Sequence, residues 1–153
     1  MIAEVDNIDR KLLRLLQNDA SLSVDALADK VHLSRNACWR RIKRLENDGI
    51  IQRRVVIIDP AKIGLSLQAL VVIKTNDHST AWLKVFRQTI RKMPEVISAQ
   101  RMTGDLDYVL RIRVADVPAY DQFYQRLIEK VQLADISASF VMEDVKETTA
   151  IPV

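Results

Sequence analysis

The sequence contains few of the residues that bend, interrupt or crosslink a chain. Among 153 residues there are 3 Gly, 4 Pro and a single cysteine, Cys38. One cysteine excludes an intramolecular disulfide and favours a reducing compartment. So little Gly and Pro excludes a low-complexity tail or a long flexible linker. The length allows one domain or two small ones.

Segments that direct a protein to or across a membrane are also lacking. No stretch approaches the roughly 18 apolar residues that a membrane span requires. The N-terminal segment MIAEVDNIDRKLL contains acids and has no basic region before a long apolar run, unlike a signal peptide. We therefore expect a soluble, cytoplasmic protein with no membrane partner.

The residue combinations that carry catalysis or bind metals are missing. The two histidines, His32 and His78, have no Cys or carboxylate group at metal-ligand spacing. There is no Ser-His-Asp order, nucleophile elbow or Gly-rich phosphate loop. We expect no metal, no cofactor and no enzymatic activity.

Positive charge is concentrated in one segment of the chain. The formal net charge is only +3, but Lys30 to Arg54 contains eight basic and two acidic residues, a local charge of +6. The rest of the chain therefore sums to −3. Concentrated charge on a nearly neutral protein is typical of a phosphate-binding face.

Three polar residues mark the starts of three short helices in this half. Asp6, Ser23 and Ser34 each precede an amphipathic pattern and are expected to act as N-caps. His32-Leu33 forms a tight turn between the second and third helices. Two short helices joined in this way are typical of a helix-turn-helix, whose second helix enters a DNA major groove.

The third helix has a clear buried side and a clear end. Cys38, Ile42 and Leu45 follow the spacing i, i+4, i+7, and Gly49 supplies the residue that a helix C-terminus commonly needs. Ile51–Ile58 reads as a strand, which with its two arginines predicts a basic hairpin, or wing. The pattern as a whole predicts a winged helix-turn-helix that binds duplex DNA.

The side of the third helix away from its buried residues carries the candidate DNA contacts. Arg and Asn at its N-terminal end are suited to read base edges, whereas later basic residues contact phosphates. The predicted DNA-binding residues are Ser34, Arg35, Asn36, Trp39, Arg40, Lys43 and Arg44 on the helix, and Arg53 and Arg54 on the wing. Trp39 either stacks near DNA or, slightly favoured, packs between helices, and Arg41 either faces solvent or forms an internal ion pair, for example with Glu46. A merely solvated basic helix is the alternative, which the surrounding caps, turn and hairpin disfavour.

The second half contains an internal repeat. Two apolar helical patterns, Trp82 to Met93 and Tyr120 to Val131, lie 38 residues apart. Each lies between predicted strands, which are Leu67–Lys74, Val96–Thr103, Tyr108–Val114 and Ile136–Met142. This β-α-β-β-α-β order predicts a ferredoxin-like sheet with both helices on one face. The other face keeps apolar residues, so we expect sheet-to-sheet self-association about a two-fold axis.

The run IDRKLLRLLQNDASLSVDALADKVHLSRNACWRRIKRLENDGII, a linking strand, and then GDLDYVLRIRV resembles the Lrp/AsnC family of regulators over nearly the whole chain. The resemblance implies an α+β protein in which a helix-turn-helix domain (residues 1–51) and a linking strand or wing (52–65) precede a RAM or ACT-like domain for effector binding and oligomerisation (66–153). It also implies homodimers that assemble into tetramers or octamers. Many members respond to a small amino acid near the central hairpin of that domain.

Carried over to this chain, the effector site falls on the hairpin around Gly104 and on the last strand. Backbone N–H groups at a Gly-containing turn bind a carboxylate, and a nearby acid holds an ammonium group. The predicted effector-binding residues are Met102, Thr103, Gly104, Asp105, Asp107 and Tyr108, with Ser137 and Ser139 as weaker candidates. The alternative is an ordinary turn, because Gly-Asp is a common turn pair.

The prediction is a transcriptional regulator of the Lrp/AsnC type whose sequence-specific DNA binding or assembly changes with a small amino acid such as leucine or methionine. The competing hypothesis is an effector-independent architectural protein that bends DNA. The two differ in the ratio of specific to non-specific affinity, which for a regulator is roughly 10³ or more.

Overall fold

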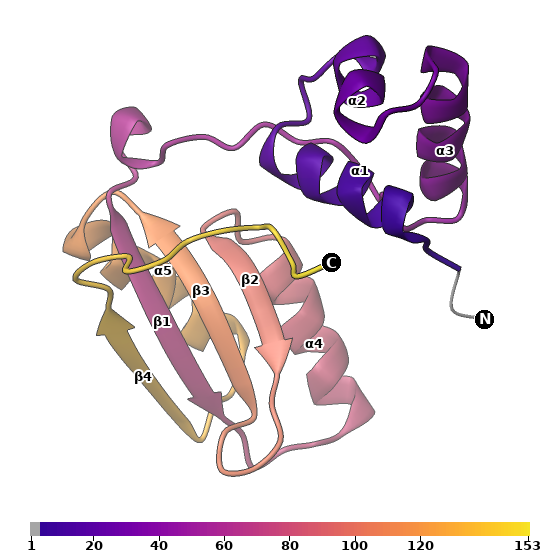
Figure 1. The fold of residues 1–153 in the computed structure, drawn as a ribbon. Helices are drawn as coiled ribbons and strands as arrows, with labels where there is room; N and C mark the ends of the chain where they lie inside the picture. The colour runs from indigo at the N-terminus through magenta and orange to yellow at the C-terminus, as the bar shows by residue number, and fades with distance from the viewer. Residues whose placement is uncertain (1–3) are drawn as a thin grey trace. The chain divides into compact units, whose positions relative to one another are not determined.

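The computed structural model describes residues 4–153, which form two compact units (Figure 1). The head unit contains the described residues up to Ile57 together with Lys146–Val153, and the sensor unit contains Ile58–Val145. The α+β fold class, a helix-turn-helix followed by a βαββαβ sheet domain, is confirmed.

Three helices form the head unit, and each starts at its predicted cap. They are α1 (Asn7–Asn18), α2 (Val24–Val31) and α3 (Arg35–Asn47). The side chains of Asp6, Ser23 and Ser34 accept hydrogen bonds from backbone N–H groups that the first helical turn leaves unpaired. The helices enclose a small apolar core formed by Leu12, Leu27, Ala28, Val31, Cys38 and Ile42.

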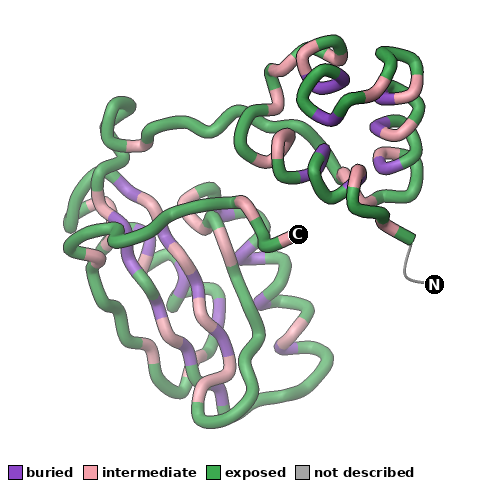
Figure 2. The backbone as a smooth tube through the Cα atoms, viewed as in Figure 1, coloured by how far each residue is buried: buried purple, intermediate pink, exposed green. Residues whose placement is uncertain are grey.

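The strand expected over Ile51–Ile58 is not formed. Residues 52–59 have no strand assignment, and Val55, Val56, Ile57 and Ile58 are all exposed (Figure 2). A strand needs a neighbour for its backbone hydrogen bonds, and the described part of this chain supplies none. A 3-10 turn, Ala61–Ile63, follows and ends at Gly64, whose φ of 80° suits glycine.

The sensor unit is a four-stranded antiparallel sheet with two helices. Its elements are β1 (Leu67–Lys74), α4 (Thr80–Arg91), β2 (Val96–Arg101), β3 (Tyr108–Val114), α5 (Val117–Lys130) and β4 (Asp135–Phe140), with strand order β2-β3-β1-β4. β2 and β4 end two residues earlier than predicted. At the end of β2, the backbone bond from Met102 N–H to the carbonyl of Asp107 already closes the hairpin at 2.8 Å.

Both helices cover one face of this sheet, as the repeat predicted (Figure 1). Val71 and Leu110 point to that face and are fully buried, in one core with Phe86 of α4 and Phe123 of α5. Alternate residues point to the other face, which no helix of the sensor unit covers.

Candidate DNA-binding face and effector hairpin

The turn between α2 and α3 orients α3 by local backbone geometry. His32 adopts the left-handed conformation at φ 55°, which ends α2, and the Leu33 N–H then bonds the carbonyl of Ala28 at 3.0 Å. The Ser34 hydroxyl accepts the Ala37 N–H at 3.3 Å and starts α3. Because Cys38 faces the head core, the opposite side of α3 faces solvent.

All nine predicted DNA contacts are exposed. They are Ser34, Arg35, Asn36, Trp39, Arg40, Lys43, Arg44, Arg53 and Arg54. Trp39 is 50% exposed, so the slightly favoured expectation that it packs between helices is wrong. Its position on the flank, next to Arg40, leaves its ring available for contact with a partner.

Several of these cations already have carboxylate partners within the head. Arg35 lies 3.4 Å from Asp25, but both side chains are largely exposed, so this pair adds little stability. Lys43 and Arg54 share one acid, Glu46, at 2.7 and 3.3 Å. The hydrogen bond from Lys43 is the main cause that lowers the pKa of Glu46.

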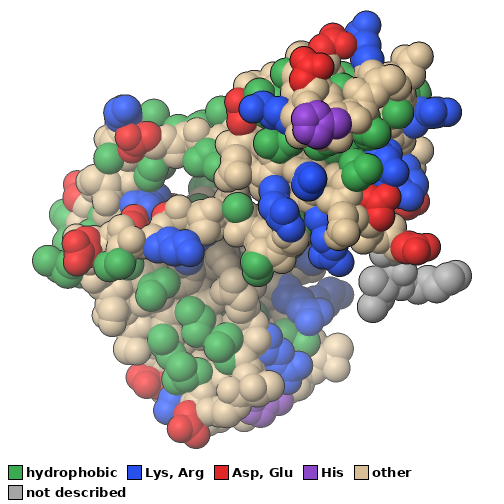
Figure 3. Space-filling model, in the orientation of Figure 1, with side chains coloured by type: hydrophobic (Ala, Val, Ile, Leu, Met, Phe, Trp, Pro, Cys, Tyr) green, Lys and Arg blue, Asp and Glu red, His purple; other side chains and the backbone are tan. Residues whose placement is uncertain are grey.

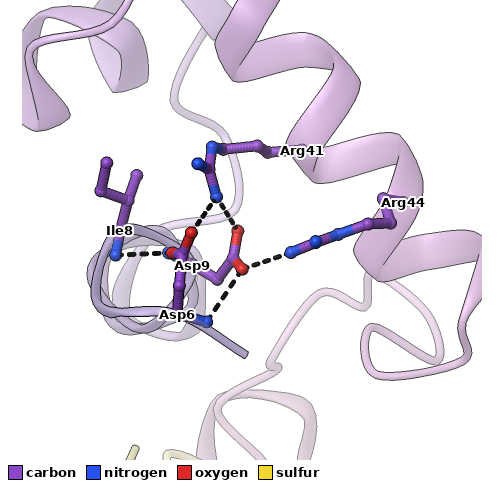
Figure 4. Close-up of polar contacts among 5 residues, drawn as sticks. All are labelled: Asp6, Ile8, Asp9, Arg41 and Arg44. Carbon is purple, nitrogen blue, oxygen red and sulfur yellow. Dashed lines mark hydrogen bonds and ion pairs between the residues drawn. The ribbon is translucent and has the colours of Figure 1, made fainter. Parts of the chain in front are cut away.

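The strongest charge cluster joins α3 to the start of α1 (Figure 4). Asp9 is fully buried, and its carboxylate accepts hydrogen bonds from Arg41 at 2.9 Å, from Arg44, and from the backbone N–H of Asp6 at 3.1 Å. Arg41 also donates to Asp6 at 2.6 Å. Two guanidinium groups and a backbone N–H offset the cost of burying this carboxylate.

Arg41 therefore forms the internal ion pair that was one of its two expected roles, but its partners are Asp6 and Asp9, and the example partner, Glu46, is wrong. Five residues along a helix turn the side-chain direction by roughly 140°, so these two side chains point to different sides of α3. Arg41 faces α1 instead, where Asp6 and Asp9 lie. The backbone N–H of Asp9, followed by the Arg41 side chain, lowers the pKa of Asp6 to about 2.

Arg44 contacts both a buried carboxylate and solvent. One of its nitrogens bonds the buried carboxylate of Asp9, yet 46% of its side chain is exposed. A guanidinium has five N–H donors, so Arg44 keeps donors for a phosphate while Asp9 holds its orientation.

The hairpin between β2 and β3 splits into an exposed tip and a fastened base. Met102, Thr103, Gly104 and Asp105 are exposed, and Gly104 has a φ of 98°. At the base, the carboxylate of Asp107 accepts a hydrogen bond from the backbone N–H of Thr75, the residue after β1, at 2.8 Å. Four consecutive exposed residues leave the tip open to a ligand or to another subunit.

Tyr108 is held in the core. Its ring lies 4.4 Å from Phe86 and 5.9 Å from Trp82, centroid to centroid, and only 8% of the residue is exposed. It therefore supports the base of the hairpin from the helix-covered face.

Ser137 and Ser139 do not converge with the hairpin in one protomer. They pair with Val72 and Leu70 on β1 and point to the open face of the sheet. Val72 in turn pairs with Val109 of β3, so the small hydroxyl side chains of β4 lie beside apolar side chains of β1 on this face. Hydrophobic side chains gather on this face of the sensor unit in Figure 3.

A loop that the sequence analysis did not single out completes the corner beside the hairpin. The hydroxyl of Thr75 accepts the Asp77 N–H at 3.1 Å, and Asp77 accepts the Ser79 N–H at 2.7 Å, which lowers the pKa of Asp77. His78 lies 3.9 Å from Asp107. The spacing Thr-x-Asp-x-Ser is a recognisable turn signal, but nothing in it indicates the long-range contact with the hairpin.

Within residues 4–153 no helix is long and apolar enough to cross a membrane. The same residues contain no group of three or more His, Cys, Asp or Glu side chains placed to hold a metal ion.

Comparisons with known families and proteins match both units. Residues 5–52 match the winged helix-turn-helix DNA-binding family, and residues 68–151 match the Lrp/AsnC ligand binding domain. The chain is 50% identical to the DNA-binding transcriptional activator DecR of Escherichia coli K12 over 97% of this chain and 99% of that protein.

Two solved structures share the fold closely. An AsnC family transcriptional regulator from Agrobacterium tumefaciens has a TM-score of 0.93 and 48% identity, covering 97% of both chains. A transcriptional regulator from Neisseria meningitidis, solved in complex with L-methionine, also has a TM-score of 0.93, with 32% identity over 97% of both chains.

Proposed function

This chain belongs to the Lrp/AsnC family of DNA-binding transcriptional regulators, and we propose that a small amino acid, leucine or methionine, controls its sequence-specific DNA binding or its assembly. The exposed cationic side of α3 supports a role in DNA recognition. As a regulator of transcription rather than an enzyme, the protein acts in the cytoplasm through binding alone.

The effector proposal rests above all on the likeness to the Neisseria meningitidis regulator that binds L-methionine. In this chain the corresponding ligand would lie at the hairpin tip, with backbone N–H groups near Gly104 binding its carboxylate and Asp105 binding its ammonium group. Asp107 and Tyr108 act differently: they hold the hairpin base through Thr75 and the aromatic core. Met102 and Thr103 would line the ligand.

A second copy of the chain is needed to complete this arrangement. The open sheet face carries Leu70, Val72 and Val109, which a two-fold symmetric partner would cover. Further association into tetramers or octamers would place the hairpin tips of neighbouring dimers together. Ser137 and Ser139 would then reach a ligand only across such contacts. The proposed division of labour is residues 1–51 for DNA, 52–65 for linkage, and 66–153 for effector and assembly.

A thermal-shift screen against the twenty amino acids tests the effector proposal. A ligand at 100 times its Kd stabilises the native state by about 2.7 kcal/mol, which raises Tm by several degrees. We expect a selective shift with leucine or methionine that Asp105→Ala abolishes while DNA binding stays near normal. No shift with any amino acid would favour the effector-independent architectural protein.

DNA titrations test how α3 reads its site. Arg35→Ala should lower the ratio of specific to non-specific affinity, because a bidentate contact to guanine contributes about 1–3 kcal/mol of discrimination. Arg40→Ala should weaken binding to all duplexes alike. Equal loss on every duplex from both variants would contradict this division. A specific to non-specific ratio near one for the wild type would support the architectural alternative.

A further inference from the structure

Residues 146–153 follow the sensor unit in the chain but belong to the head unit. The chain therefore passes between the two units twice, once after Ile57 and once before Lys146. We call residues 146–153 the strap.

The strap is bound to α1 through its backbone. The side-chain amide of Gln17 accepts the Ile151 N–H at 2.7 Å and donates to the Ile151 carbonyl at 3.2 Å. Arg14 donates from Nε to the carbonyl of Val153 at 2.7 Å. A primary amide that bonds both the N–H and the carbonyl of one residue satisfies both of its backbone polar groups, so Gln17 fixes Ile151 against α1. Thr149, Ile151 and Val153 line one groove with Leu13 and Leu16.

The chain just before the strap is fixed to the sheet. The Val141 N–H bonds the Gln68 carbonyl of β1 at 2.9 Å, and Asp144 lies 4.0 Å from Arg113 of β3. Between these anchors and Ile151 the chain is short. The seven residues from Asp144 to Ile151 span at most about 25 Å, which limits how far the point where the strap binds α1 can move from the sheet.

We propose that the strap is a second tether, which restricts motion of the head relative to the sensor unit and transmits effector binding from β4 to the DNA-binding helix. The transmission step rests on the proposed function. Among the described residues β4 is an edge strand that pairs with β1, and its Ser137 and Ser139 lie nine and seven residues before the start of the strap. A ligand that favours one position of β4 thereby favours one position of the strap and of α1, and coupling needs no other connection.

Distance measurements between the units test the tether without any ligand. Spin labels at Asp29→Cys on α2 and Lys84→Cys on α4 would report the spread of distances, with labelled protein diluted in unlabelled protein. Cys38 stays unlabelled because it is buried, and burial raises the pKa of its thiol. Gln17→Met removes both bonds to Ile151 at similar side-chain size. We expect a distribution up to about twofold wider, approaching that of units joined by one linker, because the strap then keeps only the Arg14 bond and its groove contacts with α1.

Lys11→Met is the matched control, because Lys11 is an exposed residue of the same helix. It should leave the distribution unchanged, and circular dichroism should show equal helix content in both variants. Hydrogen exchange at the Ile151 amide should be about five- to thirtyfold faster in Gln17→Met, because two hydrogen bonds are lost. An unchanged distance distribution in Gln17→Met would overturn the proposal.

DNA affinity measured with and without L-methionine or L-leucine tests the transmission. The duplex is the tightest binder selected from a randomised pool. Where either amino acid changes wild-type affinity, Gln17→Met should reduce that change to less than about a third, with unchanged binding of the amino acid by calorimetry. A fully retained change would overturn the transmission. If neither amino acid binds the wild type, the effector assignment fails, and the distance distributions alone decide the tether.

Discussion

The head and the sensor unit hold their functional side chains by different forces. In the head, a fully buried carboxylate, Asp9, joins Arg41 and Arg44 of α3 to the start of α1. In the sensor unit, packed aromatic rings support the hairpin, with the ring centroid of Phe86 4.4 Å from that of Tyr108 and 5.0 Å from that of Trp82.

This difference indicates how each unit meets its partner. Charge-assisted hydrogen bonds are directional, so Asp9 orients Arg41 and Arg44 of α3 before any DNA is bound. Apolar packing fixes the hairpin base but leaves its tip and the open sheet face without cover. Under the proposed function, the candidate DNA-binding residues all lie on one chain, whereas a second chain would cover the open sheet face of the sensor unit.

The largest expected effect is on stability, from removing an aromatic ring of the sensor core. Tyr108→Ala should lower the free energy of unfolding by about 3–5 kcal/mol, because it removes a ring packed against Phe86 and Trp82. Tyr108→Phe keeps the ring and should change both stability and amino-acid binding little. Urea unfolding and calorimetry measure the two. Loss of amino-acid binding in Tyr108→Phe with normal stability would instead make the hydroxyl a ligand contact.

The next largest effect is expected from removing the buried carboxylate of Asp9 in the head unit. Asp9→Ala should cost about 2 kcal/mol, less than the 3–5 kcal/mol typical of a fully buried pair, since the side chains of Arg41 and Arg44 are 29% and 46% exposed and can hydrate. It should also weaken DNA binding, because Arg44 loses its orientation. Asp25→Ala, which removes only the exposed pair with Arg35, is the control for urea unfolding. Equal losses in the two variants would show that the buried cluster has no special role.

The same comparison explains what the sequence could predict. The caps at Asp6, Ser23 and Ser34 and the strand positions depend on near neighbours and on periodicity, so they are readable along the chain. The pairing of Arg41 with Asp9 is not, because it depends on how α3 docks on α1. The strap is a stronger case, since Gln17 and Ile151 are 134 residues apart.

The predictions for Ile51–Ile58 and for the effector residues depend on pairing partners that the sequence of one chain does not reveal. An apolar, β-branched run indicates a strand only when another strand pairs with it, and the described residues contain none for this segment. The hairpin tip was predicted as a ligand site through resemblance, and its contacts beyond one chain cannot be read from periodicity. The turn at Thr75 to Ser79 could be predicted from its residue types. Its hydrogen bond to Asp107 could not, because the two segments are distant in the sequence.

A smaller effect concerns the acid that partners two candidate phosphate contacts. Glu46→Gln should tighten binding to all duplexes about two- to threefold, because Lys43 and Arg54 no longer have an anionic partner to leave. Lys43→Ala should reduce the slope of log K against log salt by about 0.9. Fluorescence anisotropy at several salt concentrations measures both. Weaker binding in Glu46→Gln would mean that Glu46 positions these cations rather than competing for them.

The smallest effect is a pH dependence of the head. The pKa of Asp6 is lowered to about 2 by the backbone N–H of Asp9 and by Arg41, so its folded-state pKa lies below the ordinary value of 3.8. A carboxyl with a lowered folded pKa contributes stability above its unfolded pKa, and this contribution is lost as pH falls from about 4 towards 2. Asp6→Asn should therefore be less stable than wild type at neutral pH and should approach it in acid. Urea unfolding between pH 2.5 and 7, with Asp29→Asn at an exposed position of α2 as a control outside the arginine cluster, separates this contribution from general acid destabilisation. A constant difference between Asp6→Asn and wild type across that range would assign the effect to the lost cap geometry rather than to charge.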